Sequence, residues 1–184
     1  TNSATASIDG VTDSDTATVD SVSALIGIAK SFGAIVDNGN GTYTVPVTLT
    51  LENFGLETLN SVRVTDDLTT EFGTYQTPIG NVDVLGEYTV ENLASPTLTI
   101  NAAFNGSGDQ NLLDGTDTMA PGATATITFD LTFYPNMATA PFTNQATAIG
   151  TGATSGAITT DISTDGADPD PGADDIPEED TASV

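Results

Sequence analysis

Lys30 is one of only two basic residues in a chain that carries 26 acidic ones. It falls in the apolar run 25–32, where it alternates in phase with Ile26 and Ile28 and so shares the face of the larger apolar side chains. An ammonium group is costly to bury unless it is paired. The pattern therefore favours a lysine that snorkels or forms an ion pair near a strand end, or one whose amine is used in a covalent bond.

The chain positions of Lys30 and Asn144 resemble those of some bacterial pilin and adhesin sandwiches, which tie their first and last strands together. The resemblance implies an intramolecular isopeptide bond from Lys30 to Asn144. A nearby acid, such as Glu52 or Asp66, would catalyse it. The folded protein would then be lighter by one ammonia.

Carboxylates gather at the C-terminal end, in residues 161–184. Ca²⁺ takes several oxygen ligands in an adaptable geometry, and alternating carboxyl or hydroxyl residues with a glycine at the bend supply them. The start of this segment matches the first half of a helix-flanked calcium loop, but the last position of that loop would be Gly172 instead of Glu. The alternative is a solvated acidic linker stiffened by prolines. The predicted calcium ligands are Asp161, Ser163, Asp165, Asp168, Asp170, Asp174 and Asp175.

Composition excludes several classes of function. The formal charge of −24 repels nucleic acid and anionic membrane surfaces. Cysteine, histidine and tryptophan are absent, which removes disulfides, thiolate chemistry and imidazole metal sites. Asp66 and Asp67 are poorly placed as a catalytic pair, because neighbouring residues on a strand point to opposite faces. We expect no enzymatic activity, no direct membrane insertion, and an export signal, if one exists, outside residues 1–20.

The residue mix, rich in Thr, Val, Ile and Gly, favours strands joined by tight turns. Residues 123–133 and 42–51 alternate most clearly between apolar and polar side chains. Pro46 interrupts the second run and suggests an edge position or a bulge. Shorter candidate strands are 24–32, 59–65, 82–93, 97–104, 142–149 and 157–162. Together they predict an all-β fold, an antiparallel immunoglobulin-like β-sandwich of about seven or eight strands.

The two ends of the chain nearly repeat each other in the same order. Residues 1–6 resemble 143–148, and residues 15–19 resemble 180–184. We interpret residues 1–21 as a leading segment that completes or pairs with a neighbouring domain, 22–160 as the sandwich, and 161–184 as an acidic exit linker. The residues predicted to join copies are Thr1, Asn2, Ala4, Thr5, Ala6 and Ile8.

A string of motifs between about residues 24 and 184 resembles the conserved repeat domain of bacterial surface proteins known as domain of unknown function 11. That resemblance implies an immunoglobulin-like sandwich, usually in tandem within long extracellular chains, with no catalytic residues to transfer. Phe54 and the leading segment depart from the pattern. The motifs are 28–31, 36–45, 51–55, 62–68, 112–115, 120–122, 144–148 and 163–170.

These observations predict a structural repeat or subunit of an extracellular or cell-surface bacterial fibre, whose partners are other copies of itself, head to tail, with a calcium-stiffened junction. The copies are either tandem repeats of one polypeptide or subunits that exchange strands. The alternative is an adhesin module that binds a glycan or another cell surface through its loops. Its candidate aromatic residues are Tyr75, Tyr88, Phe104 and Tyr134.

Overall fold

The computed structural model describes residues 2–9, 11–17, 23–73, 88–135, 141–174, 176–177 and 182–183. These residues form strands and one four-residue helix, α1 (Thr69–Phe72). The strands are β1 (Asn2–Ile8), β2 (Val11–Ala17), β3 (Ile26–Phe32), β4 (Val36–Asp37), β5 (Tyr43–Asn53), β6 (Leu59–Asp66), β7 (Tyr88–Ala94), β8 (Thr118–Met119), β9 (Thr124–Phe133), β10 (Thr143–Asn144), β11 (Ala146–Gly152), β12 (Ile158–Ile162), β13 (Thr164–Asp165) and β14 (Ala182–Ser183).

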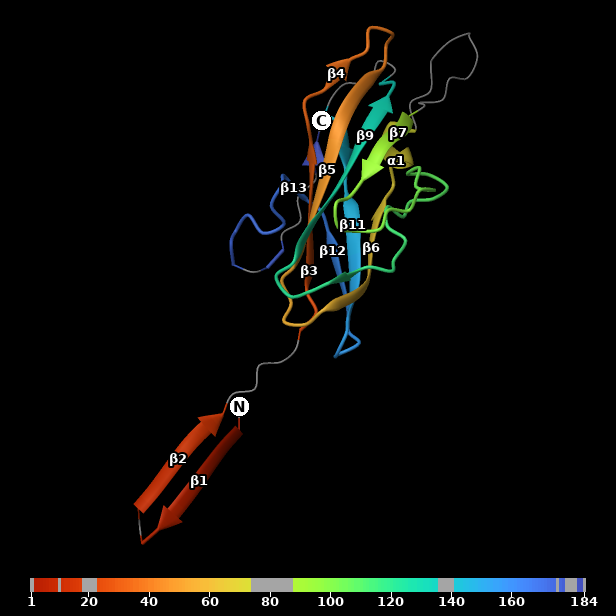
Figure 1. Cartoon of the computed structure of the whole chain (residues 1–184). Coiled ribbons are helices and arrows are strands. Elements are labelled where there is room, and N and C mark those ends of the chain that lie inside the picture. Colours follow the sequence, from red (N-terminus) through yellow and green to blue (C-terminus); the bar gives the residue numbers. More distant parts are fainter. Residues whose placement is uncertain are drawn as a thin grey trace.

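Two sheets form the body of the molecule (Figure 1). One has the strand order β13-β3-β5-β9-β7, with β4 added to β5, and the other has the order β12-β11-β6-β8. All neighbours pair antiparallel except β13 and β3, which are parallel. The predicted all-β, antiparallel immunoglobulin-like sandwich is confirmed. Its strands of five or more residues are β3, β5, β6, β7, β9, β11 and β12.

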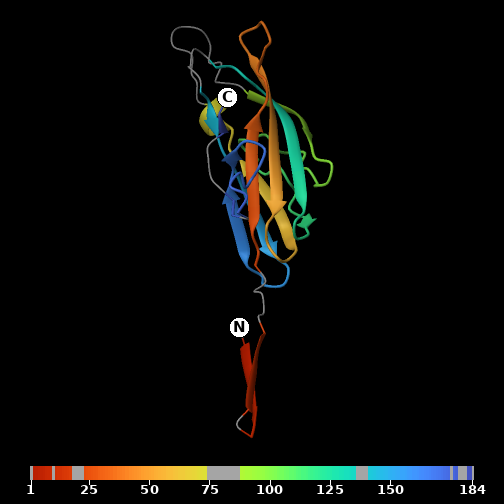
Figure 2. The same ribbon diagram turned by 90° about the vertical axis from the view of Figure 1, so that its left-hand side faces the viewer.

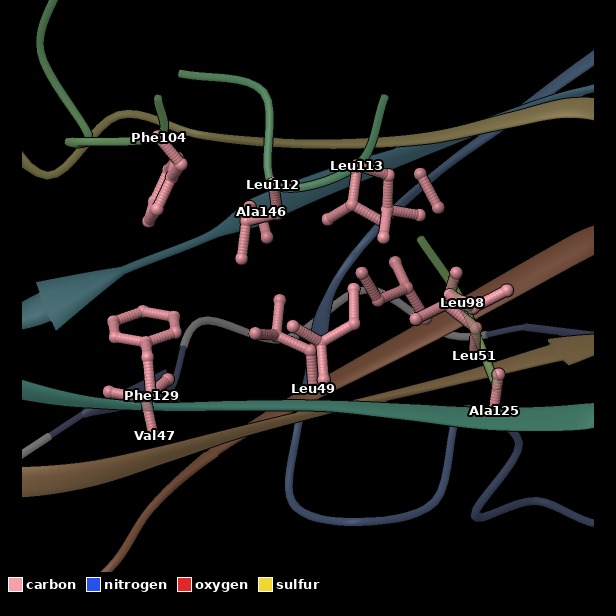
Figure 3. Close-up of a cluster of buried hydrophobic side chains, with 14 of the residues drawn as sticks. Val47, Leu49, Leu51, Leu98, Phe104, Leu112, Leu113, Ala125, Phe129 and Ala146 are labelled. Atoms are coloured by element: carbon pink, nitrogen blue, oxygen red, sulfur yellow. The ribbon is translucent and has the colours of Figure 1, made fainter. Parts of the chain in front are cut away.

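Strict alternation builds the core between the sheets. Along β5 and β9 every second side chain is buried, and the intervening ones are exposed or half-buried. In Figure 3 the side chains of Val47, Leu49 and Phe129 project toward Leu112 and Leu113 on the opposite side. Each such apolar side chain contributes about 1.5–3 kcal/mol when fully buried. The core therefore fixes which face of each strand points inward.

The edge of β3 is closed by side chains from β12, although the two strands belong to different sheets. Thr159 Oγ1 accepts the backbone N–H of Ile26 at 3.2 Å, and Asp161 Oδ2 accepts that of Ile28 at 2.7 Å. Further along, β13 pairs in parallel with residues 29–30 of β3. These contacts hold β3 against the segment that follows β11, and they satisfy donors that would otherwise be unpaired at an edge.

The N-terminal strands β1 and β2 form a hairpin of their own. Both views place it beyond one end of the sandwich (Figures 1 and 2). Within the described part of the chain, no helix has the length and apolar character required to cross a membrane.

Two segments differ from what their sequence suggested. Residues 97–104 form a loop with one isolated bridge, between Ile100 and Leu113, in place of a strand. At the C-terminal end, β12 continues through Asp161, and β13 and β14 pair with β3 and β10. Part of the predicted exit linker is therefore built into the sandwich.

Candidate crosslinking site

Lys30, Asp66 and Asn144 reach the interior from three different strands. Lys30 lies on the inward face of β3 because Ile28, two residues earlier, faces the core. Asp66 ends β6 in phase with the buried Val64. Asn144 lies on β10, just before β11, whose first residue pairs with Asp66. The alternation of each strand thus carries one polar side chain into an otherwise apolar layer.

Lys30 contacts both other side chains directly, and all three are buried. Lys30, Asp66 and Asn144 are 0%, 1% and 7% exposed. Lys30 Nζ donates to Asp66 Oδ2 and to Asn144 Oδ1. On its far side, Asn144 Nδ2 donates to the backbone carbonyl of Asp67 at 3.0 Å, which fixes the orientation of the amide. The ring of Phe32 lies 5.5 Å from Nζ.

Electrostatics favour a nucleophilic amine at this position. Burial lowers the pKa of Lys30 from its ordinary value of 10.5, and the neighbouring Asp66 carboxylate only partly opposes that effect. Among the described residues Nζ has two hydrogen-bond acceptors, which match the two N–H groups of a neutral amine. A neutral amine retains the lone pair that an attack on a carbonyl carbon requires.

Asp66 is placed to move protons for such an attack. Its Oδ2 already accepts from Nζ, while its Oδ1 and Thr164 Oγ1 are the described buried side-chain atoms without a hydrogen-bond partner. Oδ1 is therefore free to carry a proton. Nζ would attack Cγ of Asn144, forming the new N–C bond as the Cγ–Nδ2 bond breaks. Asp66 would take the proton from Nζ and deliver one to Nδ2, which leaves as ammonia.

A surface pocket of about 450 Å³ adjoins the acceptor amide. Its lining includes Asn144 itself, together with Thr143 and Gln145 on the same segment and Asp67 and Glu71 opposite. Ammonia released at Asn144 would therefore reach solvent through this pocket.

The structure separates the two acids that the sequence offered as catalysts. Asp66 touches Lys30, whereas Glu52 pairs in register with Gly27, three positions away along β3, and alternates with the buried Leu51 on the other face of β5. The signal that distinguishes them was already present in the sequence. Asp66 is in phase with Val64, while Glu52 is in phase with the outward threonines of its strand.

The predicted calcium ligands are dispersed over β12, β13 and the loop that follows. Asp161 bonds to β3 as described, and Ser163 Oγ accepts the backbone N–H of Ala146 at 3.0 Å. Asp168 and Asp174 are exposed and accept backbone N–H groups within their own loop, as does the buried Asp170. Within the described ranges no three Asp or Glu side chains cluster as a metal site. The calcium site stays a prediction.

Asp165 is exposed and pairs with Lys30 through the backbone, and Asp175 lies outside the described residues. Of the predicted joining residues, Asn2, Ala4, Thr5, Ala6 and Ile8 belong to β1, and Thr1 lies outside the described residues.

The aromatic residues considered for a binding face are mostly engaged elsewhere. Phe104 is buried against Phe129, with ring centroids 5.8 Å apart. Tyr88 is half-buried and shares a hydrogen bond of 3.0 Å with Thr69. Tyr75 lies outside the described residues.

Comparison with known proteins adds little to this geometry. No protein-family model matches the chain, and no curated protein matches it. Among solved structures, the chain is similar to the N-terminal domain of PorA, with 12% sequence identity and a TM-score of 0.32 over 77% of this chain and 98% of that one. So distant a likeness carries no functional argument, and the proposals below depend on the residues of this chain.

Proposed function

We propose that this chain is a structural module of an extracellular bacterial surface fibre, and that an isopeptide bond between Lys30 and Asn144 locks its sandwich. The observation that carries the proposal is the contact of a buried lysine amine with both a carboxylate and an asparagine amide. Burying a lysine amine is expensive, and the contact with Asp66 offsets only part of that cost. A covalent bond would turn the amine into an uncharged amide and remove the cost permanently.

The position of the bond suits a load-bearing module. Lys30 belongs to the first strand of the sandwich, and Asn144 begins the segment that closes it, 114 positions later. Tension applied at the two ends of the chain would pass through the bond and bypass the residues in between. The bond also spans the two sheets, because β3 belongs to one and β10 leads into a strand of the other. Peeling the sheets apart would require breaking a covalent bond.

The chemistry is a single event within one molecule. The chain would act on itself once and release one ammonia, so no substrate pocket or turnover is implied. This agrees with the expectation that the protein is not an enzyme.

Joining of copies head to tail and stiffening by calcium complete the proposal. The carboxylates of Asp165, Asp168 and Asp174 remain exposed near the C-terminal end. Calcium bound there would offset their mutual repulsion and restrain the junction. Thermal melting with calcium and with a chelator tests this part, and identical melting curves would argue against it.

Intact mass of the purified, folded protein tests the crosslink. The expected mass is that of the sequence minus one ammonia, and a protease digest should contain a branched peptide joining Lys30 to Asn144. The variants Lys30→Met and Asn144→Ala should each show the full mass of their sequences. A wild-type protein of full mass would refute the crosslink. Electron microscopy of native material tests the fibre, and dispersed single particles would count against it.

A further inference from the structure

The N-terminal hairpin pairs its residues in the same way as the segment that closes the sandwich. In the hairpin, Asn2 lies opposite Ala17, and Ala6 lies opposite Asp13. In the closing segment, Asn144 of β10 lies opposite Ala182 of β14, and Ala148 of β11 lies opposite Asp161 of β12. The likeness between the two ends of the sequence is thus also a likeness of strand register.

This agreement in register does not follow from the sequence repeat alone. The hairpin lacks counterparts to the turn 153–157 and to most of residues 163–181, which include β13. Yet Asp161 and Ala182, which follow the two omissions, face partners that match those of Asp13 and Ala17. Because register decides which residues share a face of a strand pair, residues at matching positions occupy matching faces. The hairpin is a trimmed copy of the closing segment.

The closing segment engages β3 through three polar side chains, those of Asn144, Thr159 and Asp161. Asn144 meets the amine of Lys30, and Asp161 accepts the N–H of Ile28, so both act on β3. The hairpin carries the same residue types at two of these three positions, Asn2 and Asp13, and has Val11 at the position of Thr159.

The first part of the strand between those two residues also matches, whereas Ile8 takes the position of Gly150, beside which Leu59 packs. Ala146 and Ala148 of β11 are buried against β6, where their small side chains permit close packing. The hairpin has Ala4 and Ala6 at these positions.

The hairpin cannot close the sandwich of its own chain, because β10, β11 and β12 already occupy the closing position. Both views show it apart from the sandwich (Figures 1 and 2). We propose that residues 2–17 close another domain of the same fold. That domain presents a lysine and an acid at the positions of Lys30 and Asp66 and lacks its own closing segment. Asn2 is the crosslink acceptor of that domain.

The reaction is the one described for Asn144. The lysine amine forms a bond to Cγ of Asn2, the bond from Cγ to Nδ2 breaks, and ammonia leaves with a proton delivered by the acid. Successive modules are then joined by an isopeptide bond at each junction in addition to any contacts of their surfaces. This inference depends on the proposed crosslink, because it transfers the role of Asn144 to Asn2.

A graft within the whole chain provides the test. Residues 143–184 are replaced by a second copy of residues 1–19, so that the hairpin must close the sandwich that contains Lys30. We expect a cooperative thermal transition, the loss of one ammonia, and a branched peptide that joins Lys30 to the grafted asparagine. The matched control is the same graft with its asparagine changed to alanine, which should fold with full mass.

A second graft removes fewer residues, so that a failure of the first graft to fold can be interpreted. It replaces only residues 143–162 with residues 1–14 and keeps 163–184. If either graft folds but retains its ammonia while the wild-type protein loses one, the inference about Asn2 is wrong and the Lys30–Asn144 crosslink stands. If neither graft folds, the hairpin cannot close this sandwich and the inference is also wrong. If the wild-type protein retains its ammonia, the proposed crosslink itself fails.

Discussion

If Lys30 and Asn144 are joined as proposed, removing the acceptor amide should cost this protein much of its stability, because the bond would constrain the unfolded chain. In Asn144→Ala the loop between Lys30 and position 144 is no longer closed. For a loop of 114 positions, the chain-entropy model gives a loss of about 5 kcal/mol. At about 2–4 °C per kcal/mol for a chain of this size, the melting temperature should fall by about 10–20 °C.

The assay compares melting of the wild-type protein, Asn144→Ala and a control, Asn111→Ala. Asn111 is a half-buried asparagine that donates one side-chain hydrogen bond, to Asp109 at 3.3 Å, and takes no part in the crosslink. The control should lose about 1 kcal/mol, a few degrees, and keep the mass of its crosslinked form. In strong denaturant the wild-type chain should have a smaller hydrodynamic radius than Asn144→Ala, since its loop stays closed. Equal radii, or equal losses of stability in the two variants, would refute the reasoning.

Three further predictions concern neighbouring features. Asp66→Asn should fold with full mass because it cannot move protons, whereas Glu52→Gln should lose ammonia like the wild type, and mass spectrometry reads both. Hydrogen bonds, first from Ser155, lower the pKa of Glu57 below its ordinary value of 4.5. The ionised carboxylate therefore stabilises the fold above pH 4.5, and this stabilisation is lost as the pH falls through the lowered pKa. The melting temperature of Glu57→Gln should accordingly decline less steeply in acid than that of the wild type. Asp161→Ala leaves the N–H of Ile28 unpaired and should cost about 1–3 kcal/mol in chemical denaturation, while the same change at an exposed linker aspartate should cost about 0.5 kcal/mol or less.

The fold class and the inward position of Lys30 could be predicted from the sequence because both follow from alternation. Strands such as β5 and β9 carry long period-two patterns, and Lys30 keeps the phase of Ile26 and Ile28. The same reasoning, applied to β6, would have selected Asp66 over Glu52. Alternation shows which face of a strand is buried but not which strands are neighbours. The meeting of Lys30 with Asn144 therefore depended on a resemblance until the topology was known.

Two local features of the fold could not be predicted from the pattern of apolar and polar residues, for physical reasons. Residues 97–104 have strand-like composition, but Asn101 bonds to backbone groups of its own loop, including the N–H of Ala103 at 3.0 Å, and so competes with sheet pairing. Pro46 suggested an edge or a bulge, yet β5 lies between β3 and β9. The proline is accommodated because β3 ends at Phe32, and only the N–H of Gly33 reaches the carbonyl of Pro46, at 2.8 Å.

The place where the bond ties the chain also determines what a protease could accomplish. With Lys30 joined to Asn144, every peptide bond between them lies inside a closed ring. A single cut in that ring opens it but severs nothing, since the covalent path from one terminus to the other runs through the side chains. Only cuts before Lys30 or after Asn144 divide the molecule. A fibre built from such modules would survive a nick in any loop between Lys30 and Asn144. Its vulnerable points would be the stretches between modules and the part of each module that follows Asn144, which includes the turn 153–157.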